Sequence, residues 1–289
     1  MTRPRPLRAL TLFDLALLLT LALVLLHSLA VESRALAIAM IVAALPPALL
    51  PRVREHAVTW LALTAIVGVS VAAAWLWADN HKFLLVYWCL ALACGFASAR
   101  PRRVIARAAR LLIGLCFAFA GAWKLLTPDY LDGRAFHYLL LEDARFAPLA
   151  RWLGADAELR AHNLSLRDAI PEELVEVTLR DAPALHATAL ALTWWTVLIE
   201  LAIAALFLRA AWTERPRGPG RAPPARDLAL LLFIATTYTL APVPGFAWLL
   251  IAMGLTQTPP GRAGHPARVA YVAALLLTQV YFAIYELTG

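Results

Sequence analysis

Lys124, His81 and Glu200 could do acid–base chemistry, because each lies in or beside a long apolar run. The chain uses arginine for nearly every positive charge, and only Lys82 and Lys124 are lysines among its 26 basic residues. Arginine keeps its proton in proteins, whereas a lysine removed from water can lose its proton and act as a base or nucleophile. Lys124 is therefore the first candidate for a catalytic residue.

Lys124 ends an apolar run in the stretch GAWKLL, residues 121–126. A second interpretation is that its long side chain reaches the lipid headgroups beside an interfacial tryptophan, Trp123, as lysines at the ends of membrane helices commonly do. The sequence alone leaves both interpretations open.

His81 and Glu200 each allow two interpretations as well. His81, in DNHKF at 79–83, could donate a hydrogen bond to a substrate or orient the lysine, or it could face solvent at the membrane surface. Glu200 lies within WWTVLIELAIAALFL at 194–208. A carboxylate inside a membrane span indicates a functional site, although it could also be protonated or bonded to a neighbouring helix.

The composition is that of a membrane protein. Hydrophobic residues make up 62% of the 289 and charged residues 16%, against about 45–50% and about 25% in soluble domains. The net charge of +7 therefore does not indicate a nucleic-acid partner. Cys89, Cys94 and Cys116 lie in apolar runs without a histidine cluster, so neither a metal site nor a disulfide framework is predicted.

The elements that must position these residues are transmembrane helices, each of which needs about 20 mostly apolar residues. We predict about nine, the first an uncleaved helix rather than a signal peptide. Residues 227–257 could instead form a re-entrant pair. The predicted spans are 12–31, 34–50, 57–78, 83–99, 107–126, 185–208, 227–241, 244–257 and 268–287.

The arginines predict the orientation, because cytoplasmic loops carry an excess of basic residues. The basic clusters fall in alternate loops, as nine spans with the amino terminus inside require. This topology places His81 and Lys124 at the same, outer face. The clusters are Arg3, Arg5 and Arg8; Arg52 and Arg54; Arg100, Arg102, Arg103 and Arg107; Arg209, Arg215, Arg217, Arg221 and Arg226; and Arg262 and Arg268.

The predicted fold is all-α, a polytopic bundle that forms one integral membrane domain. Helices one to five occupy 1–126 and helices six to nine occupy 185–289, with a cytoplasmic Pro/Arg linker at 209–227. The acidic segment 127–184 begins with the helix-start pattern Thr-Pro-Asp. We expect it to form a helical cap on the extracytoplasmic face.

Two motifs resemble those of the vitamin-K-dependent gamma-carboxylase superfamily, which includes the bacterial horizontally transferred transmembrane (HTTM) proteins. The stretch 79–84 is similar to the family's NHxYL-type motif. Gly121 to Leu125, followed by Pro128-Asp129-Tyr130 and Gly133, is similar to its AGxxKL…DW…G motif. The resemblance implies His81 as an orienting residue and Lys124 as the catalytic base. Substrate contacts are then expected at Asn80, Trp123, Tyr130 and Glu200.

The resemblance implies a membrane enzyme of the carbon–carbon lyase type, in which the lysine deprotonates a reduced quinone of the vitamin K hydroquinone type, with O2 and CO2 as co-substrates and no metal. The sequence departs from that family in two places. It ends at Gly289, just after the last predicted span, and TTYTLAPVPGF at 236–246 lacks the family's later histidine. We therefore expect base chemistry on a lipid-soluble, quinol-type molecule, with its coupling to carboxylation left open.

The expected partners are the lipid bilayer and a lipid-soluble small molecule, with no protein substrate identified. The expected location is the bacterial inner (cell) membrane. Two other functions remain open: a non-enzymatic, DoxX-like membrane module linked to quinones, and a transporter. A transporter is the weaker alternative, because the sequence shows neither an internal repeat nor many mid-membrane charges.

Overall fold

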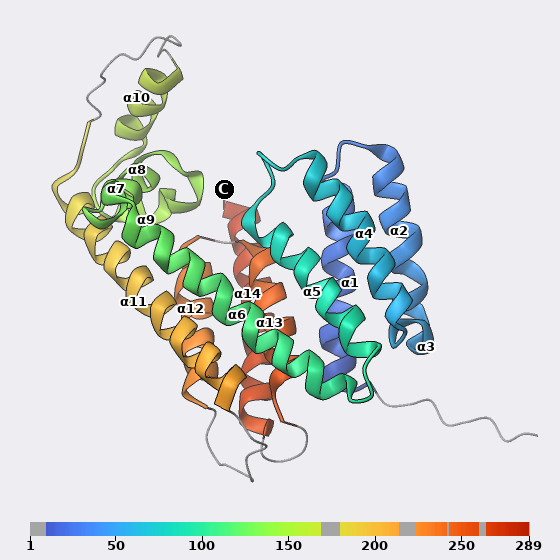
Figure 1. Cartoon of the computed structure of the whole chain (residues 1–289). Coiled ribbons are helices and arrows are strands. Elements are labelled where there is room, and N and C mark those ends of the chain that lie inside the picture. Colours follow the sequence, from blue (N-terminus) through green and yellow to red (C-terminus); the bar gives the residue numbers. More distant parts are fainter. Residues whose placement is uncertain (1–9, 169–179, 214–223, 242, 260–263, 289) are drawn as a thin grey trace, which may run out of the picture.

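The computed structural model describes residues 10–168, 180–213, 224–241, 243–259 and 264–288, and within these ranges it contains helices and no strand (Figure 1). The elements are α1 (Leu12–Leu29), α2 (Arg34–Leu49), α3 (Pro51–Arg54), α4 (Ala57–Ala73), α5 (Asn80–Phe96), α6 (Pro101–Leu126), α7 (Pro128–Leu131), α8 (Arg134–Glu142), η1 (Ala144–Phe146), α9 (Ala147–Trp152), α10 (Ala157–Asp168), α11 (Pro183–Thr213), α12 (Ala225–Leu240), α13 (Pro244–Gln257) and α14 (His265–Thr288).

Each predicted span coincides with a helix: α1, α2, α4, α5, α6, α11, α12, α13 and α14. Among the described residues, α1, α6 and α11 are both long and apolar enough to cross a membrane, while α2, α4 and α5 are apolar but shorter. The all-helical fold and the three long apolar helices are the features of a helical membrane protein.

Several boundaries differ from the prediction. The span 57–78 is helical only to Ala73, and the tryptophans beyond it lie exposed in the turn that leads to α5. α11 is longer than 185–208: it begins at Pro183, a residue favoured in the first turn of a helix, and runs to Thr213. The predicted linker 209–227 is therefore helical at both ends, and its centre, 214–223, lies outside the described residues.

The core of the bundle surrounds α13. This helix packs against α1, α6 and α14, and its residues from Leu249 to Gln257 are all buried. It has 14 residues and is therefore about 21 Å long at 1.5 Å per residue, shorter than the roughly 30 Å hydrocarbon layer. A short, uniformly apolar helix of this kind is stable because neighbouring helices enclose it.

α6 and α11 form the closest antiparallel pair. Small residues on α6 allow the approach: a Cβ added at Gly114 would lie 2.8 Å from Leu208, and one at Gly121 would lie 2.7 Å from Leu201. Gly114 thus lies against Leu208, whereas Gly121, seven residues later in α6, lies against Leu201, seven residues earlier in α11. The two helices therefore run antiparallel. These contacts fix which residues of the two helices lie opposite one another.

The segment α7–α10 lies at one end of the bundle, beside the first half of α11 (Figure 1). It has a small core of its own, in which Leu140, Leu141 and Phe146 pack with Leu185 and Ala189 of α11. We call α7–α10 the cap. α3, the α5–α6 turn, the end of α11 and the start of α12 lie at the opposite end (Figure 1).

Asn163 of α10 closes the cap onto the start of α11. Its side chain is buried and forms two hydrogen bonds of 2.9 Å with the backbone of Arg180. Because both amide atoms are engaged, this asparagine is a structural residue.

Gly133 connects the cap to α11 through a conformation that other residues adopt only with strain. Its φ is +87°, and an added Cβ would lie 3.2 Å from the backbone nitrogen of Leu190. Gly154 shares the positive φ, at +97°, but its Cβ would meet only the Ala182 side chain at 3.8 Å.

We therefore predict that Gly133→Ala destabilises the protein more than Gly154→Ala does. The left-handed conformation costs about 1–2 kcal/mol for a residue with a Cβ, so Gly154→Ala should lose about 1 kcal/mol. Gly133→Ala should lose clearly more, because it adds a backbone clash. Unfolding in mixed detergent micelles measures both, and equal losses would show that the contact with Leu190 is unimportant.

Candidate functional site

Lys124 and Glu200 form an ion pair between α6 and α11. The Lys124 Nζ lies 2.8 Å from Oε1 and 2.6 Å from Oε2 of Glu200, so the ammonium group donates to both carboxylate oxygens. The lysine side chain is 17% exposed and the glutamate side chain 8%. Two of the residues predicted to form the site thus meet directly, although 76 positions separate them in the sequence.

The length of α11 explains why a glutamate in the middle of an apolar helix meets a lysine near the end of another. The first turns of α11, from Leu185 to Ala189, pack within the cap. Glu200 therefore lies near the boundary between the cap and the bundle, where α6 is about to end at Leu126. The sequence placed Glu200 inside the predicted span 185–208, which begins two residues after the start of α11 at Pro183.

One face of α11 carries the site. The buried residues Ala189, Thr193, Thr196 and Glu200 recur at intervals of three and four, the spacing of one helical face. Along this face, Leu190 contacts Gly133, Thr196 contacts Tyr130 and Glu200 contacts Lys124. α11 thus acts as the rigid support against which α6 and the start of the cap are aligned.

Tyr130 of α7 covers the ion pair. The Lys124 Nζ lies 5.4 Å from the centre of the tyrosine ring, within the range of a cation–π contact. The Tyr130 hydroxyl lies 3.0 Å from Oγ1 of Thr196. Burial raises the pKa of Tyr130, and the nearby Glu200 carboxylate raises it further, while the bond with Thr196 acts in the opposite direction. The phenol is therefore neutral at ordinary pH.

Tyr238, on α12, belongs to the same region but was not predicted from the sequence. Its side chain is 5% exposed, and its hydroxyl has no hydrogen-bond partner among the described residues. It lies within electrostatic reach of Glu200 and Cys116. Its ring contacts Phe233 and Phe246 at centroid distances of 5.9 and 6.3 Å. A buried hydroxyl without a partner is uncommon and usually indicates an unseen water, ion or ligand.

His81 lies at the same end of the bundle, in a separate environment at the start of α5. A Cβ added at Gly245 would lie 3.0 Å from the Nε2 of His81, so the imidazole packs on the first turn of α13. In the described part of the chain, no hydrogen bond or ion pair joins His81 to Lys124. Phe246 follows Gly245 and stacks on Phe117 at 6.4 Å. The first turn of α13 thus contacts both His81 and an aromatic side chain of α6.

The other groups beside His81 are Asp79, Lys82 and His27. The Lys82 Nζ lies 2.9 Å from Oδ2 of Asp79, and this side-chain hydrogen bond is the main reason that the pKa of Asp79 is lowered. Nε2 of His27 lies 2.9 Å from Oγ of Ser70. His81 therefore faces a small polar group formed by α1, α4 and α5.

Asn80 and Trp123, both predicted to contact a substrate, are exposed in this structure. Trp123 is 72% exposed on α6. Among the described residues, no group of three or more histidine, cysteine or acidic side chains could hold a metal ion.

The chemistry available here is proton transfer. The ammonium and carboxylate groups are in direct contact, away from bulk water, so a proton can pass between them without separating charge over a distance. A hydroxylated molecule placed beside the pair could lose its proton to it, and the remaining positive charge would stabilise the new anion. Such a dyad can therefore act as a base toward an uncharged substrate.

Comparison with protein-family models, with curated proteins and with solved structures finds no match for this chain. The resemblance to the gamma-carboxylase superfamily therefore stays a hypothesis, which rests on the two motifs described above.

We predict that removing one charge of the ion pair destabilises the protein more than removing both charges does. Lys124→Met leaves a buried carboxylate without its cation and should destabilise the protein by about 3 kcal/mol. Lys124→Met combined with Glu200→Leu removes both charges and should come within about 1 kcal/mol of the wild type. Unfolding in mixed micelles gives the three free energies.

The exposed pair of Arg134 and Asp129 is the matched control, since their side chains are 73% and 72% exposed. Arg134→Met should change the stability by less than about 1 kcal/mol. If Lys124→Met proved as mild as this control, the Lys124–Glu200 contact would not be a buried ion pair.

Proposed function

We propose that this protein is a multi-pass membrane enzyme in which Lys124 and Glu200 act together as an acid–base pair on a lipid-soluble, quinol-type substrate. The proposal includes nine spans, an amino terminus on the cytoplasmic side and a site at the outer face. It carries over the resemblance to the gamma-carboxylase and HTTM proteins, with His81 as an orienting donor. The expected location is the inner membrane of a bacterium.

Exposed apolar side chains support a membrane setting. Ile38, Val42, Phe119 and Leu198 are 60–72% exposed on α2, α6 and α11, where water would be a poor environment for them. Four of the most exposed tryptophans lie near the ends of the helices: Trp75, Trp77 and Trp123 toward the cap, and Trp212 at the end of α11. This distribution is typical of side chains at the two membrane–water boundaries.

The observation that carries the proposed activity is the buried contact between the Lys124 ammonium and both oxygens of Glu200. In water the proton would belong to the lysine. Burial disfavours charged forms, so the neutral pair, an amine beside a carboxylic acid, comes closer in energy to the ion pair. Glu200 thus gives Lys124 a route to the free amine without releasing a proton to solvent.

In the proposed step, the Lys124 amine takes the proton of a substrate hydroxyl. The substrate O–H bond breaks, an N–H bond forms, and the product is an oxyanion beside an ammonium group, with Glu200 neutral. The same state is reached if Glu200 takes the proton directly while Lys124 keeps its charge. The two routes differ in which residue accepts the proton of the substrate, Lys124 or Glu200. Substitutions can therefore distinguish them.

The surroundings suit an aromatic, lipid-soluble substrate. Phe117, Phe233, Tyr238 and Phe246 form a connected set of rings, and the Tyr238 hydroxyl is available to bind an oxygen atom. A substrate that diffuses in the bilayer can reach this end of the bundle from the side. A reduced quinone fits this description, with O2 as its oxidant, and CO2 enters only if the resulting base drives a carboxylation.

The arginine pattern gives a prediction for topology. A reporter enzyme that is active only outside the cytoplasm should be inactive when fused after Arg103 and active when fused after Asp181. A fluorescent reporter that matures only in the cytoplasm should give the reverse result at both positions. The same outcome at the two positions would contradict the proposed arrangement.

The lysine gives a prediction for catalysis. Lys124→Arg keeps the positive charge and can still form two bonds to Glu200, so the variant should fold and insert normally. Arginine cannot act as a base, and the turnover of a reduced naphthoquinone in proteoliposomes under oxygen should fall by about 10²–10⁴-fold. Chromatography of the quinone products measures this loss.

Glu200→Gln is the companion variant, because it leaves the lysine amine in place and removes the carboxylate. It should keep more activity than Lys124→Arg. Near-native turnover of Lys124→Arg together with an inactive Glu200→Gln would assign the base to Glu200 instead. If the wild type did not consume the reduced naphthoquinone, the quinol assignment would be wrong.

A further inference from the structure

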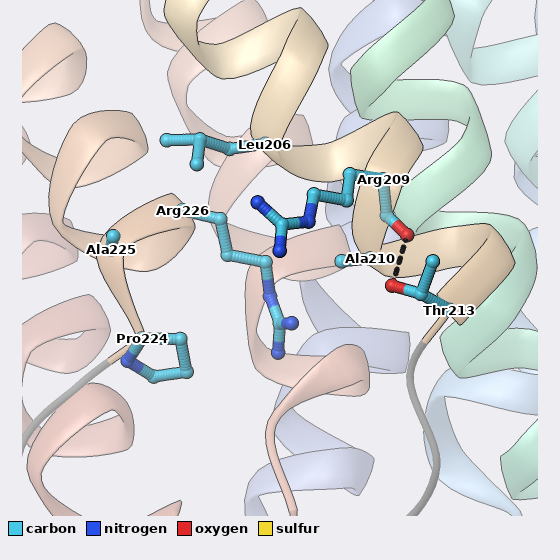
Figure 2. Close-up of a pocket in the computed structure, with 7 residues that line it drawn as sticks. All are labelled: Leu206, Arg209, Ala210, Thr213, Pro224, Ala225 and Arg226. Atoms are coloured by element: carbon cyan, nitrogen blue, oxygen red, sulfur yellow. Dashed lines mark hydrogen bonds between the residues drawn. The ribbon is translucent and has the colours of Figure 1, made fainter.

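A second charged site lies at the end of the bundle opposite the cap. The end of α11 and the start of α12 line an open pocket with a volume of about 260 Å³. Two arginines from different helices, Arg209 and Arg226, line it together with apolar Leu206 and Ala210. Figure 2 shows the Arg209 guanidinium group directed toward the Arg226 side chain, whose own guanidinium group extends away from Leu206. The site shares no residue with the Lys124–Glu200 pair, and the inference does not depend on the function proposed above.

Arg226 is held in place by a hydrogen bond to the neighbouring helix α13. Its side chain is 5% exposed, and its Nε donates a hydrogen bond of 3.0 Å to Oε1 of Gln257 on α13. The Oδ2 of Asp227 lies 3.9 Å from that Nε. Because the Nε edge is bonded to the neighbouring helix, the plane of the guanidinium group has a fixed orientation.

Asp227 forms hydrogen bonds inside the bundle. Its Oδ1 accepts hydrogen bonds from the Tyr271 hydroxyl, at 2.9 Å, and from the Gln257 amide. The carboxylate is fully buried and joins α12 to α13 and α14. It offsets part of the charge of Arg226 and is not among the residues that line the pocket.

Arg209 adds a second positive charge. The described residues provide no hydrogen bond or ion pair to its guanidinium group, and only its backbone carbonyl is engaged, by the Thr213 hydroxyl at 2.7 Å (Figure 2). Among the described residues, the lining of the pocket contains these two arginines and no acidic side chain. α12 begins beside it with Pro224 as its N-cap, which supplies no side-chain hydrogen bond, and the amino-terminal end of a helix also favours anions.

We propose that this pocket binds a phosphate group. The planar guanidinium group pairs with two phosphate oxygens at once, and arginines from two helices can hold one such group between them. The volume suits a single phosphate with its ester substituent. The phosphate could belong to an anionic phospholipid, since α11 is one of the helices able to cross a membrane, or to a soluble phosphate compound. The two sources share the same chemistry at the pocket.

The test compares Arg209→Gln with Arg52→Gln in the purified full-length protein. Both arginines are exposed, so neither change should disturb the fold, and Arg52 of α3 lies away from this pocket. Dioleoylphosphatidylglycerol and dioleoylphosphatidylcholine are titrated separately and the retained lipid is counted by native mass spectrometry. Inorganic phosphate is titrated against the thermal unfolding midpoint at constant ionic strength.

A lipid site predicts that phosphatidylglycerol binds in preference to phosphatidylcholine, and that Arg209→Gln weakens this binding by about ten- to a hundredfold while Arg52→Gln does not. A site for soluble phosphate predicts that phosphate raises the unfolding midpoint of the wild type and of Arg52→Gln but not of Arg209→Gln, with no preference between the lipids. The proposal is overturned if Arg209→Gln and Arg52→Gln behave alike in both titrations.

Discussion

The contact between Lys124 and Glu200 is the interaction on which the arrangement of α6, α11 and the cap depends. At a separation of about 2.7 Å and an effective dielectric constant of about 20, the attraction is about 6 kcal/mol. Removing each ion from water costs several kcal/mol. The two effects nearly cancel, so the pair adds little net stability. Its effect is specificity, because any shift of α11 along α6 would leave a buried carboxylate without a cation. The glycine contacts at Gly121 and Gly133 select the same alignment.

The same rule applies at the other end of the bundle. Asp14 of α1 is buried and lies 3.3 Å from the buried Arg54 of α3, and Asp227 lies beside Arg226 in a network with Gln257. Each of these buried carboxylates faces a cation, while apolar side chains face outward. A protein in water would arrange its surface the other way round. The buried ion pairs of this bundle therefore determine which helices are neighbours. The apolar outer face indicates that the surrounding medium is lipid.

The helices were predictable from the sequence because apolar runs separated by arginine and proline determine them locally. α2, for example, occupies 34–49 against a predicted 34–50. Lys124 and Glu200 could both be singled out, because charged residues in apolar runs are conspicuous. Their pairing could not, since it depends on how far α11 extends into the cap. Tyr238 carries no sequence signal at all, because an unpaired hydroxyl becomes visible only when its neighbours are known. The arginine pattern indicated the face of His81 but not its packing on α13.

The position of Lys124 also bears on the two interpretations of this residue. A lysine that interacts with lipid headgroups would place its ammonium group in water. Its position would then not depend on which apolar side chains surround it. Here the ammonium turns inward to Glu200, and Tyr130 lies over it. The cap thus keeps water from the pair, because α7 begins only two residues after α6 ends. The cap is therefore part of the environment of the ion pair, since Tyr130 of α7 covers the ammonium group.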